Sequence, residues 1–68
     1  VSPDKQLSNR EKEILRLIRQ GFLSKEIAYQ LGVSIYTVNN HRKNILSKLD
    51  ANNIMEAIHI VENLGIYL

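Results

Sequence analysis

Apolar residues recur every three or four positions along most of this 68-residue chain, the spacing that places them on one face of an α-helix. Short stretches containing glycine, serine or asparagine separate four such segments. The pattern predicts helices over about 9–20, 25–31, 35–49 and 54–64, and therefore an all-α fold. The fourth segment is rich in isoleucine and valine, but its period and its boundaries favour a helix over a strand.

The boundaries of these segments carry residues that typically begin and end helices. Ser8 and Asn53 each precede a glutamate by three positions, which is the spacing of a capping box. Ser24 and Ser34 can cap the second and third helices. A glycine follows the first, second and fourth helices, where a left-handed residue costs little without a Cβ. These glycines are Gly21, Gly32 and Gly65.

The middle of the chain has the spacing of a helix-turn-helix. A small residue in the second predicted helix allows the third to approach, a glycine four positions later forms the turn, and apolar residues fix the crossing angle. The residues at these positions are Ala28, Gly32, Val33 and Val38, with Ile27 and Leu31 as further core contacts. A plain helical hairpin in a bundle is the alternative, but it does not require all six positions to agree.

One face of the third predicted helix is apolar, and the other is polar without acids. On a helical wheel, Ile45 and Leu49 fall within about 20° of Val38 and face the core. The opposite face carries Tyr36, Asn40, Lys43 and Ser47, flanked by Asn39 and Asn44. No Asp or Glu occurs in residues 35–49, although solvated helices usually pair Glu with Lys.

A polar helix face of this kind fits the major groove of DNA, where Asn can bond adenine in a bidentate manner and Lys can donate to guanine. We therefore predict sequence-specific binding of double-stranded DNA, with base contacts from Asn39, Asn40 and Lys43. Phosphate contacts would hold the helix in register. The candidates for them are Lys25, Ser34, Tyr36, Thr37, Arg42, Ser47 and Lys48. Lys25 and Lys48 could equally be ordinary solvated side chains.

The distribution of charge along the chain fits this prediction without deciding it. The net charge is only +2, but residues 24–48 carry +3 and residues 49–68 carry −3. A basic middle beside an acidic end suggests that one face meets phosphate and another does not. An ordinary mixed surface would also fit.

The composition argues against several other kinds of site. The chain has no cysteine, and His41 and His59 stand apart from any carboxylate pair, so we expect no metal and no cofactor. We expect His41 at the edge of the core with a structural hydrogen bond, and His59 in solvent. The sequence shows no nucleophile–base pair, carboxylate dyad or phosphate loop. We therefore predict that the chain is not an enzyme and binds no small molecule.

Residues throughout the chain resemble the LuxR/GerE/FixJ family of helix-turn-helix domains. The matching residues are L-S-N-R-E-K-E-I-L (7–15), Gly21, S-K-E-I-A (24–28), Leu31, V-S (33–34), T-V (37–38), His41, N-I (44–45), K-L (48–49), E-A-I (56–58) and L-G (64–65). The resemblance implies a four-helix domain with a tri-helical helix-turn-helix core and no wing. Such a domain is usually the C-terminal effector part of a bacterial transcription regulator, whose N-terminal part senses a signal. Its base-contacting positions fall on Asn39, Asn40 and Lys43.

The sequence departs from the family pattern at three positions. Asn39 stands where a basic residue is usual, which removes one positive charge and would alter the preferred target. Asp50 replaces a common glycine at the turn between the third and fourth helices, and Asp tolerates left-handed geometry less well. Ile54 stands where arginine is frequent and adds apolar surface to the start of the fourth helix.

The apolar arc of the fourth predicted helix, about 160° wide, is broader than a stripe that covers one side of a small core. We therefore predict a homodimer on DNA through Ile54, Ile58 and Val61. The alternative is that the extra apolar residues pack on the first helix and on residues 66–68. RNA polymerase is a further candidate partner, because a regulator of this kind acts on transcription.

The domain organisation follows from the same observations. Residues 1–6 have the composition of a linker end, and residues 7–68 form the predicted domain of a longer chain, since the sequence begins with Val. No apolar run approaches about 18 residues and no signal peptide is present, so we expect no membrane segment and a cytoplasmic location at the bacterial nucleoid. Two other helix-turn-helix functions remain open: protein–protein contact, and promoter binding of the sigma-factor kind. The latter does not explain His41 or E-A-I.

Overall fold

The computed structural model describes residues 7–66, which form the helices α2 (Asn9–Arg19), α3 (Ser24–Leu31), α4 (Ile35–Leu49) and α5 (Ile54–Asn63). No strand occurs in this range, so the predicted all-α, four-helix fold is confirmed. Each helix matches its predicted range to within one residue at either end. The linker predicted for residues 1–6 lies outside the described range, as do residues 67–68.

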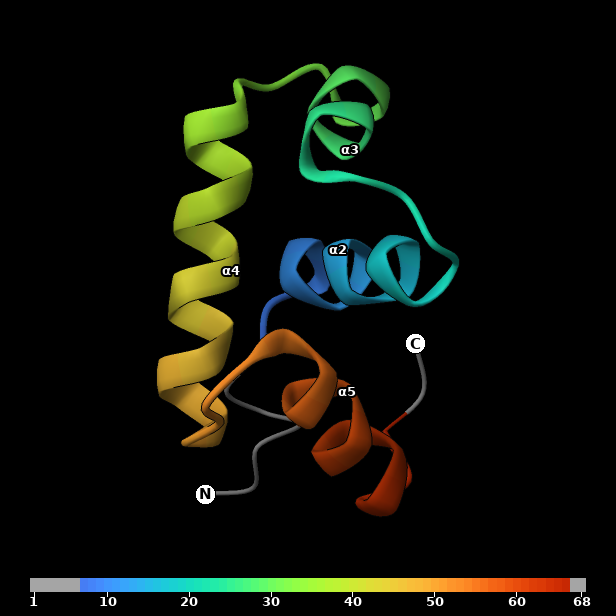
Figure 1. Ribbon diagram of the computed structural model, residues 1–68, viewed down its shortest axis with the longest axis vertical. Helices are drawn as coiled ribbons and strands as arrows, with labels where there is room; N and C mark the ends of the chain where they lie inside the picture. The colour runs from blue at the N-terminus through green and yellow to red at the C-terminus, as the bar shows by residue number, and fades with distance from the viewer. Residues whose placement is uncertain (1–6, 67–68) are drawn as a thin grey trace.

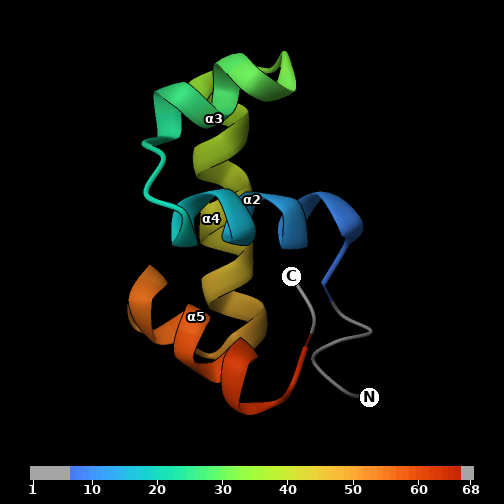
Figure 2. The same ribbon diagram turned by 90° about the vertical axis from the view of Figure 1, so that its right-hand side faces the viewer.

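Helix α4 is the element on which the other three helices are arranged. In Figure 1 it runs from top to bottom along the left side, and α3, α2 and α5 lie beside it in succession. The view turned by 90° shows the same order along α4 (Figure 2). Helices α3 and α4 cross rather than run parallel and are joined by residues 32–34, as in a helix-turn-helix. The three helices therefore cover one side of α4 and leave the opposite side open.

The core is formed by the apolar faces of all four helices. Val38 and Ile45 of α4 are fully buried and Leu49 is buried, which confirms the apolar face predicted for this helix. Ala28 of α3 is buried too, as a small residue at the helix crossing should be. The other buried apolar residues are Leu7, Ile14, Leu15, Leu17, Ile27, Ala57, Ile58 and Val61. Because the chain has no cysteine, burial of this cluster is the main favourable term for folding.

Two of the predicted N-caps fix the starts of α2 and α4. The Ser8 hydroxyl accepts a hydrogen bond from the Glu11 N–H at 3.1 Å, and the Ser8 N–H donates to Glu11 Oε1 at 2.9 Å, which completes a capping box. The Ser34 hydroxyl accepts from the Thr37 N–H at 3.1 Å. Both predictions are confirmed, and the first turn of each helix has its backbone donors satisfied locally.

The caps of α5 and α3 differ in outcome. Asn53 Oδ1 accepts from the Glu56 N–H at 2.9 Å, so the predicted cap of α5 is confirmed. The prediction that Ser24 caps α3 is wrong, because Ser24 is already helical and Leu23 holds the N-cap position. The Leu23 N–H donates to Glu26 Oε1 at 2.7 Å instead. A glutamate in the first turn therefore satisfies this helix start without a polar N-cap side chain.

Asp50 ends α4 in a left-handed conformation. It is the one residue other than glycine with a positive φ, 53°, in the described part of the chain. This conformation turns the chain so that the Ala51 N–H donates to the Leu46 carbonyl at 2.9 Å, as in a Schellman motif. Gly32 ends α3 with a similar φ of 68°. The departure from glycine at position 50 has therefore kept the backbone geometry and lost the residue best suited to it.

The wide apolar arc of α5 is explained by the core rather than by a partner. Val61 is fully buried and Ile58 is 5% exposed within the single chain, so their predicted place on a dimer surface is wrong. Ile54 is half-buried and packs against the same core. Ile66 packs there too, which agrees with the alternative as far as this residue of the range 66–68 is concerned. The large apolar side chain that α5 does expose is Met55, at 59%.

Candidate nucleic-acid interface

The open side of α4 carries the predicted base-contacting residues. Asn39, Asn40 and Lys43 are all exposed, as are Tyr36 and Ser47 on the same side of the helix. None of these side chains makes a hydrogen bond or an ion pair within residues 7–66. Their polar groups are therefore available to a ligand without breaking any contact inside the protein.

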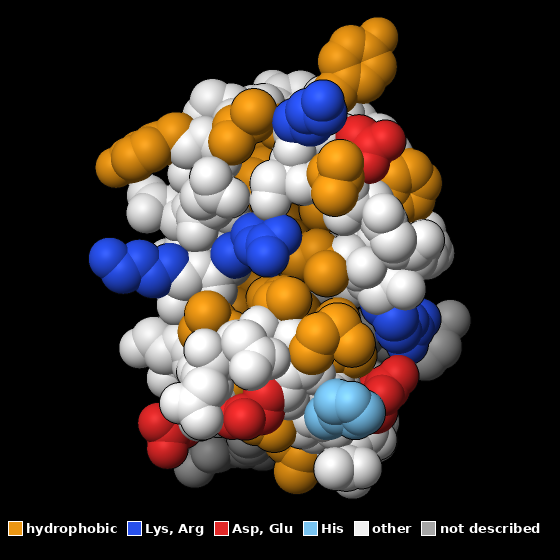
Figure 3. Space-filling view, viewed as in Figure 1, with side chains coloured by type: hydrophobic (Ala, Val, Ile, Leu, Met, Phe, Trp, Pro, Cys, Tyr) orange, Lys and Arg blue, Asp and Glu red, His pale blue; other side chains and the backbone are white. Residues whose placement is uncertain are grey.

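The charge around this face is positive because acids are absent from α4 and most cations elsewhere are engaged. Arg10 and Arg16 each lie within 4.0 Å of Glu13, and Arg19 lies 4.0 Å from Glu62. In Figure 3, Lys and Arg side chains lie beside α3 and α4, whereas Asp and Glu side chains lie mainly at the lower end near α5. Two lysines in residues 7–66 have no such partner. These are Lys25 at the start of α3 and Lys43 on α4.

The first turn of α4 brings together three predicted phosphate contacts. The Ser34 hydroxyl lies 3.0 Å from the Thr37 hydroxyl and also caps the Thr37 N–H, so both side chains are held at the helix start. Tyr36 projects from the same turn and is 75% exposed. The start of an α-helix carries a partial positive charge, which attracts anions such as a phosphate.

Arg42 connects the two helices of the helix-turn-helix. Its Nη1 donates to the Ser24 hydroxyl at 2.9 Å, across 18 positions of sequence. The side chain is half-buried, as is common for an arginine that keeps its charged head near the surface. Its guanidinium therefore lies at the start of α3, beside Ser24, the residue that precedes Lys25 in sequence.

Lys48 has a partner that the sequence pattern did not reveal. Its Nζ lies 2.7 Å from Glu11 Oε1, and Glu11 is only 3% exposed. A phosphate contact by Lys48 would have to share its ammonium group with this buried carboxylate. The capping spacing identified Glu11 as a helix-start residue, but nothing local indicated a pairing with a residue 37 positions away.

The two histidines lie in different surroundings. His59 is exposed, and His41 is half-buried at the edge of the core. The hydrogen bond expected of His41 is not found within residues 7–66, because its half-buried ring remains open to water. The same range holds no group of three or more His, Cys, Asp or Glu side chains placed to bind a metal ion.

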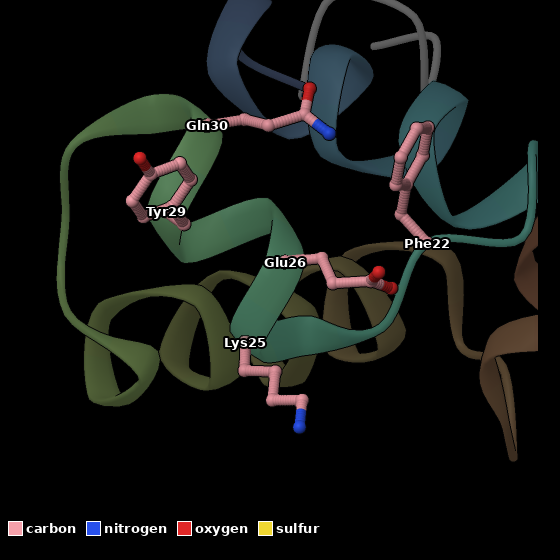
Figure 4. Close-up of a pocket in the computed structure, with 5 residues that line it drawn as sticks. All are labelled: Phe22, Lys25, Glu26, Tyr29 and Gln30. Atoms are coloured by element: carbon pink, nitrogen blue, oxygen red, sulfur yellow. The ribbon is translucent and has the colours of Figure 1, made fainter.

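A shallow depression lies on the outer side of α3. It is lined by Phe22, Lys25, Glu26, Tyr29 and Gln30 (Figure 4). In the close-up, Lys25 extends away from the other four side chains. The lining residues include no His, Cys or Ser. Separately, none of the helices in residues 7–66 is long and apolar enough to span a bilayer.

Comparison with known proteins places this arrangement in a family. The family model described as "Bacterial regulatory proteins, luxR family" matches residues 5–61. The uncharacterized response regulatory protein YgeK of Escherichia coli K12 is 48% identical over 65 residues, which cover 96% of this chain and 44% of that protein. The response regulator protein TmoT of Ectopseudomonas mendocina is 38% identical over 58 residues, which cover 85% of this chain and 26% of that protein.

A solved structure of the transcription factor GerE agrees with the fold. It superposes with a TM-score of 0.85 at 35% sequence identity, covering 96% of this chain and 92% of that one. The chain spans less than half the length of the two response regulators it matches. It shares the four-helix fold of GerE and is similar in sequence to all three proteins over most of its length. The chain therefore belongs to the luxR family of bacterial regulatory proteins.

Proposed function

We propose that this chain binds a specific sequence of double-stranded DNA with α4 in the major groove, as the effector domain of a longer transcription regulator. Asn39, Asn40 and Lys43 make the base contacts. The names of its relatives, which are response regulators and a transcription factor, support this role. Acting on DNA, the regulator works at the bacterial nucleoid, and contact with RNA polymerase is proposed for the whole regulator.

One observation carries the proposal: the open side of α4 presents amide and ammonium groups that have no use inside the protein. Asn40 and Lys43 are exposed and unpaired within residues 7–66, and α4 contains no acid that would repel phosphate. An unpaired amide can bond both N6 and N7 of adenine, and an ammonium group can donate to guanine O6 and N7. A helix-turn-helix used for protein contact has no comparable need for an acid-free face.

Phosphate contacts come from both sides of the groove-facing surface. Lys25 at the start of α3 is unpaired, and Arg42 bonds Ser24, the first residue of the same helix. The capped first turn of α4, with Ser34 and Thr37, offers hydroxyls and a helix N-terminus. These groups add affinity and fix the position of the domain on DNA, but they do not discriminate between base sequences.

Selection of bound sites from random duplex DNA tests the proposal directly. We expect an enriched sequence, and binding to it should weaken as salt rises, with log K falling by about 0.9 per log unit of salt for each phosphate neutralised. Lys43→Ala and Asn40→Ala should each lower affinity for the selected site by about 5- to 140-fold, the loss of one bidentate base contact.

Arg19→Ala is the matched control, because Arg19 lies at the end of α2 with Glu62 as its partner. It should bind the selected site as the unaltered chain does. Circular dichroism should show equal helicity for all variants, since each altered side chain is exposed. Equal binding by Lys43→Ala and the unaltered chain would reject this face of α4, and failure to enrich any sequence would favour protein–protein contact.

We further propose that two copies bind neighbouring half-sites on DNA through α5. Two-fold pairing would place two α4 helices about 34–36 Å apart, one turn of DNA. Met55 supports this proposal as the large apolar side chain exposed on α5, next to half-buried Ile54. Ile58 and Val61 contribute to this pairing only indirectly, because they pack in the core and hold α5 in place.

A further inference from the structure

Tyr36 is a large side chain with no function inside the protein. Its ring is 75% exposed on the second residue of α4, and its hydroxyl makes no hydrogen bond within residues 7–66. Exposed single apolar groups are common on protein surfaces, so exposure alone assigns nothing. The position of the ring on the groove-facing side of α4 is what distinguishes it.

The first turn of α4 holds Tyr36 in a fixed place. Ser34 caps the Thr37 N–H on one side of it, and the two hydroxyls of Ser34 and Thr37 lie 3.0 Å apart. These contacts fix the backbone on both sides of Tyr36, so that little main-chain entropy remains to be lost on binding. A ring on a fixed turn can favour one position in a DNA groove.

Tyr36 is in register with the residues proposed to contact bases. It precedes Asn40 by four positions and Lys43 by seven, so all three lie within about 60° on the helix. The rise from Tyr36 to Asn40 is about 6 Å, or fewer than two base-pair steps. Ile35 is 48% exposed as well, but it points about 100° away from Tyr36 on the helix.

The 5-methyl group of thymine is the apolar feature that the major groove offers to such a ring. Resting on the DNA binding proposed above, we infer that the Tyr36 ring contacts the methyl group of a thymine beside the base pair contacted by Asn40. The contact removes apolar surface of both groups from water. The hydroxyl keeps a water partner, because protein–DNA interfaces are wet. Tyr36 thereby helps to select the DNA sequence, in addition to any contact that it makes with a DNA phosphate.

Replacing thymine by uracil in the selected duplex removes only the methyl group and tests this inference. Each thymine of the half-site is replaced in turn, and the affinity of the 68-residue chain is measured. At one thymine we expect about a fourfold loss, the equivalent of one buried methyl group. Tyr36→Ala should bind the thymine and uracil duplexes equally. Tyr36→Phe should keep the discrimination, since it keeps the ring.

Tyr29→Ala is the matched control, because Tyr29 is 89% exposed but lies on the outer side of α3. It should discriminate thymine from uracil as the unaltered chain does. The inference is overturned if the unaltered chain binds every uracil-substituted duplex with the same affinity as the thymine duplex. It is overturned as well if Tyr36→Ala still discriminates thymine from uracil. It is also overturned if Tyr36→Phe, which keeps the ring, no longer discriminates thymine from uracil. Failure to select any sequence would instead reject the DNA binding on which it rests.

Discussion

Lys48 Nζ lies 2.7 Å from Glu11 Oε1, and this ion pair joins the last turn of the proposed recognition helix to the first turn of α2. The same Glu11 oxygen accepts the Ser8 N–H at 2.9 Å. One carboxylate therefore caps α2 and anchors the end of α4. Because α4 contacts DNA in the proposed function, the pair holds the groove-facing surface in position on the rest of the domain.

Glu11→Gln should lower the free energy of unfolding by about 1–2 kcal/mol at neutral pH. The amide can still accept the Ser8 N–H, but it replaces the ion pair with Lys48 by a weaker bond from the ammonium group to a neutral amide oxygen. Glu13→Gln is the control, because the Glu13 pairs with arginine are exposed and such pairs contribute little. Urea denaturation gives the free energy of unfolding of both variants. An equal decrease in both would mean that the buried Glu11–Lys48 pair stabilises the domain no more than the Glu13 pairs do.

The effect of Glu11→Gln should depend on pH in a defined direction. Burial raises the pKa of the Glu11 carboxyl, but the hydrogen bonds from Lys48 and Ser8 and the charge of Lys48 lower it below the ordinary 4.5. A carboxyl with a depressed pKa adds stability that is fully present above pH 4.5 and is lost as the pH falls through its folded-state value. The two curves of stability against pH should therefore converge below pH 4.5, and curves that stay parallel there would contradict this linkage.

Asp50→Gly should stabilise the domain by about 1 kcal/mol. The left-handed conformation of Asp50 costs an L-residue about 1–2 kcal/mol, and part of this gain is offset by the greater chain entropy of unfolded glycine. Asp50→Asn should give a smaller gain, because it removes only the negative charge at the end of α4. Thermal unfolding should show a rise of about 4–8 °C for Asp50→Gly. A fall would mean that the Asp50 side chain stabilises the turn.

Local spacing in the sequence predicted the helix boundaries because their contacts are local. Ser8 and Asn53 cap α2 and α5 as predicted, each by a bond to a residue three positions away. Ser24 was assigned a cap by the same logic, but its hydroxyl accepts from Arg42 instead. A periodic pattern carries no information on partners 18 or 37 positions apart, so neither Arg42–Ser24 nor Lys48–Glu11 could be inferred.

The two helices to which the proposed function assigns contacts differed in how far the sequence could describe them. The helical wheel of α4 placed Val38 in the core and Asn40 in solvent, as the structure has them, because α4 is covered on one side only. On α5 the same method predicted a partner for Ile58 and Val61, which the core buries. A helix at the end of a small domain is enclosed by the core and by the chain that follows it. The width of its apolar arc therefore depends on packing that the sequence does not show.

Arg42→Ala should weaken binding to all duplex sequences by a similar factor and reduce the salt slope by about one unit. This is the result expected for loss of a phosphate contact rather than a base contact. Ser24→Ala is the matched variant, because it removes the 2.9 Å bond and leaves the charge. It should lower stability by about 0.5–1 kcal/mol and leave the salt slope unchanged. If both variants leave the slope unchanged, Arg42 serves the α3–α4 packing alone.

Met55→Glu should separate pairing on DNA from folding. Met55 is 59% exposed, so a charge there should change the free energy of unfolding by less than about 0.5 kcal/mol, whereas Ile58→Glu would bury a charge and unfold the domain. Affinity is measured on duplexes that carry one half-site or two half-sites about one turn apart. We expect Met55→Glu to keep its affinity for one half-site and to lose the cooperative gain from the second.

The exposed change Gln20→Glu adds the same charge at the end of α2 and controls for general repulsion from DNA. If Met55→Glu loses no more cooperativity than Gln20→Glu, the exposed side of α5 does not join the two copies. Pairing would then have to involve another surface or the part of the regulator beyond this chain. A selective loss in Met55→Glu would assign to α5 two functions on opposite sides: Ile58 and Val61 hold it to the core, and Met55 contacts the second copy.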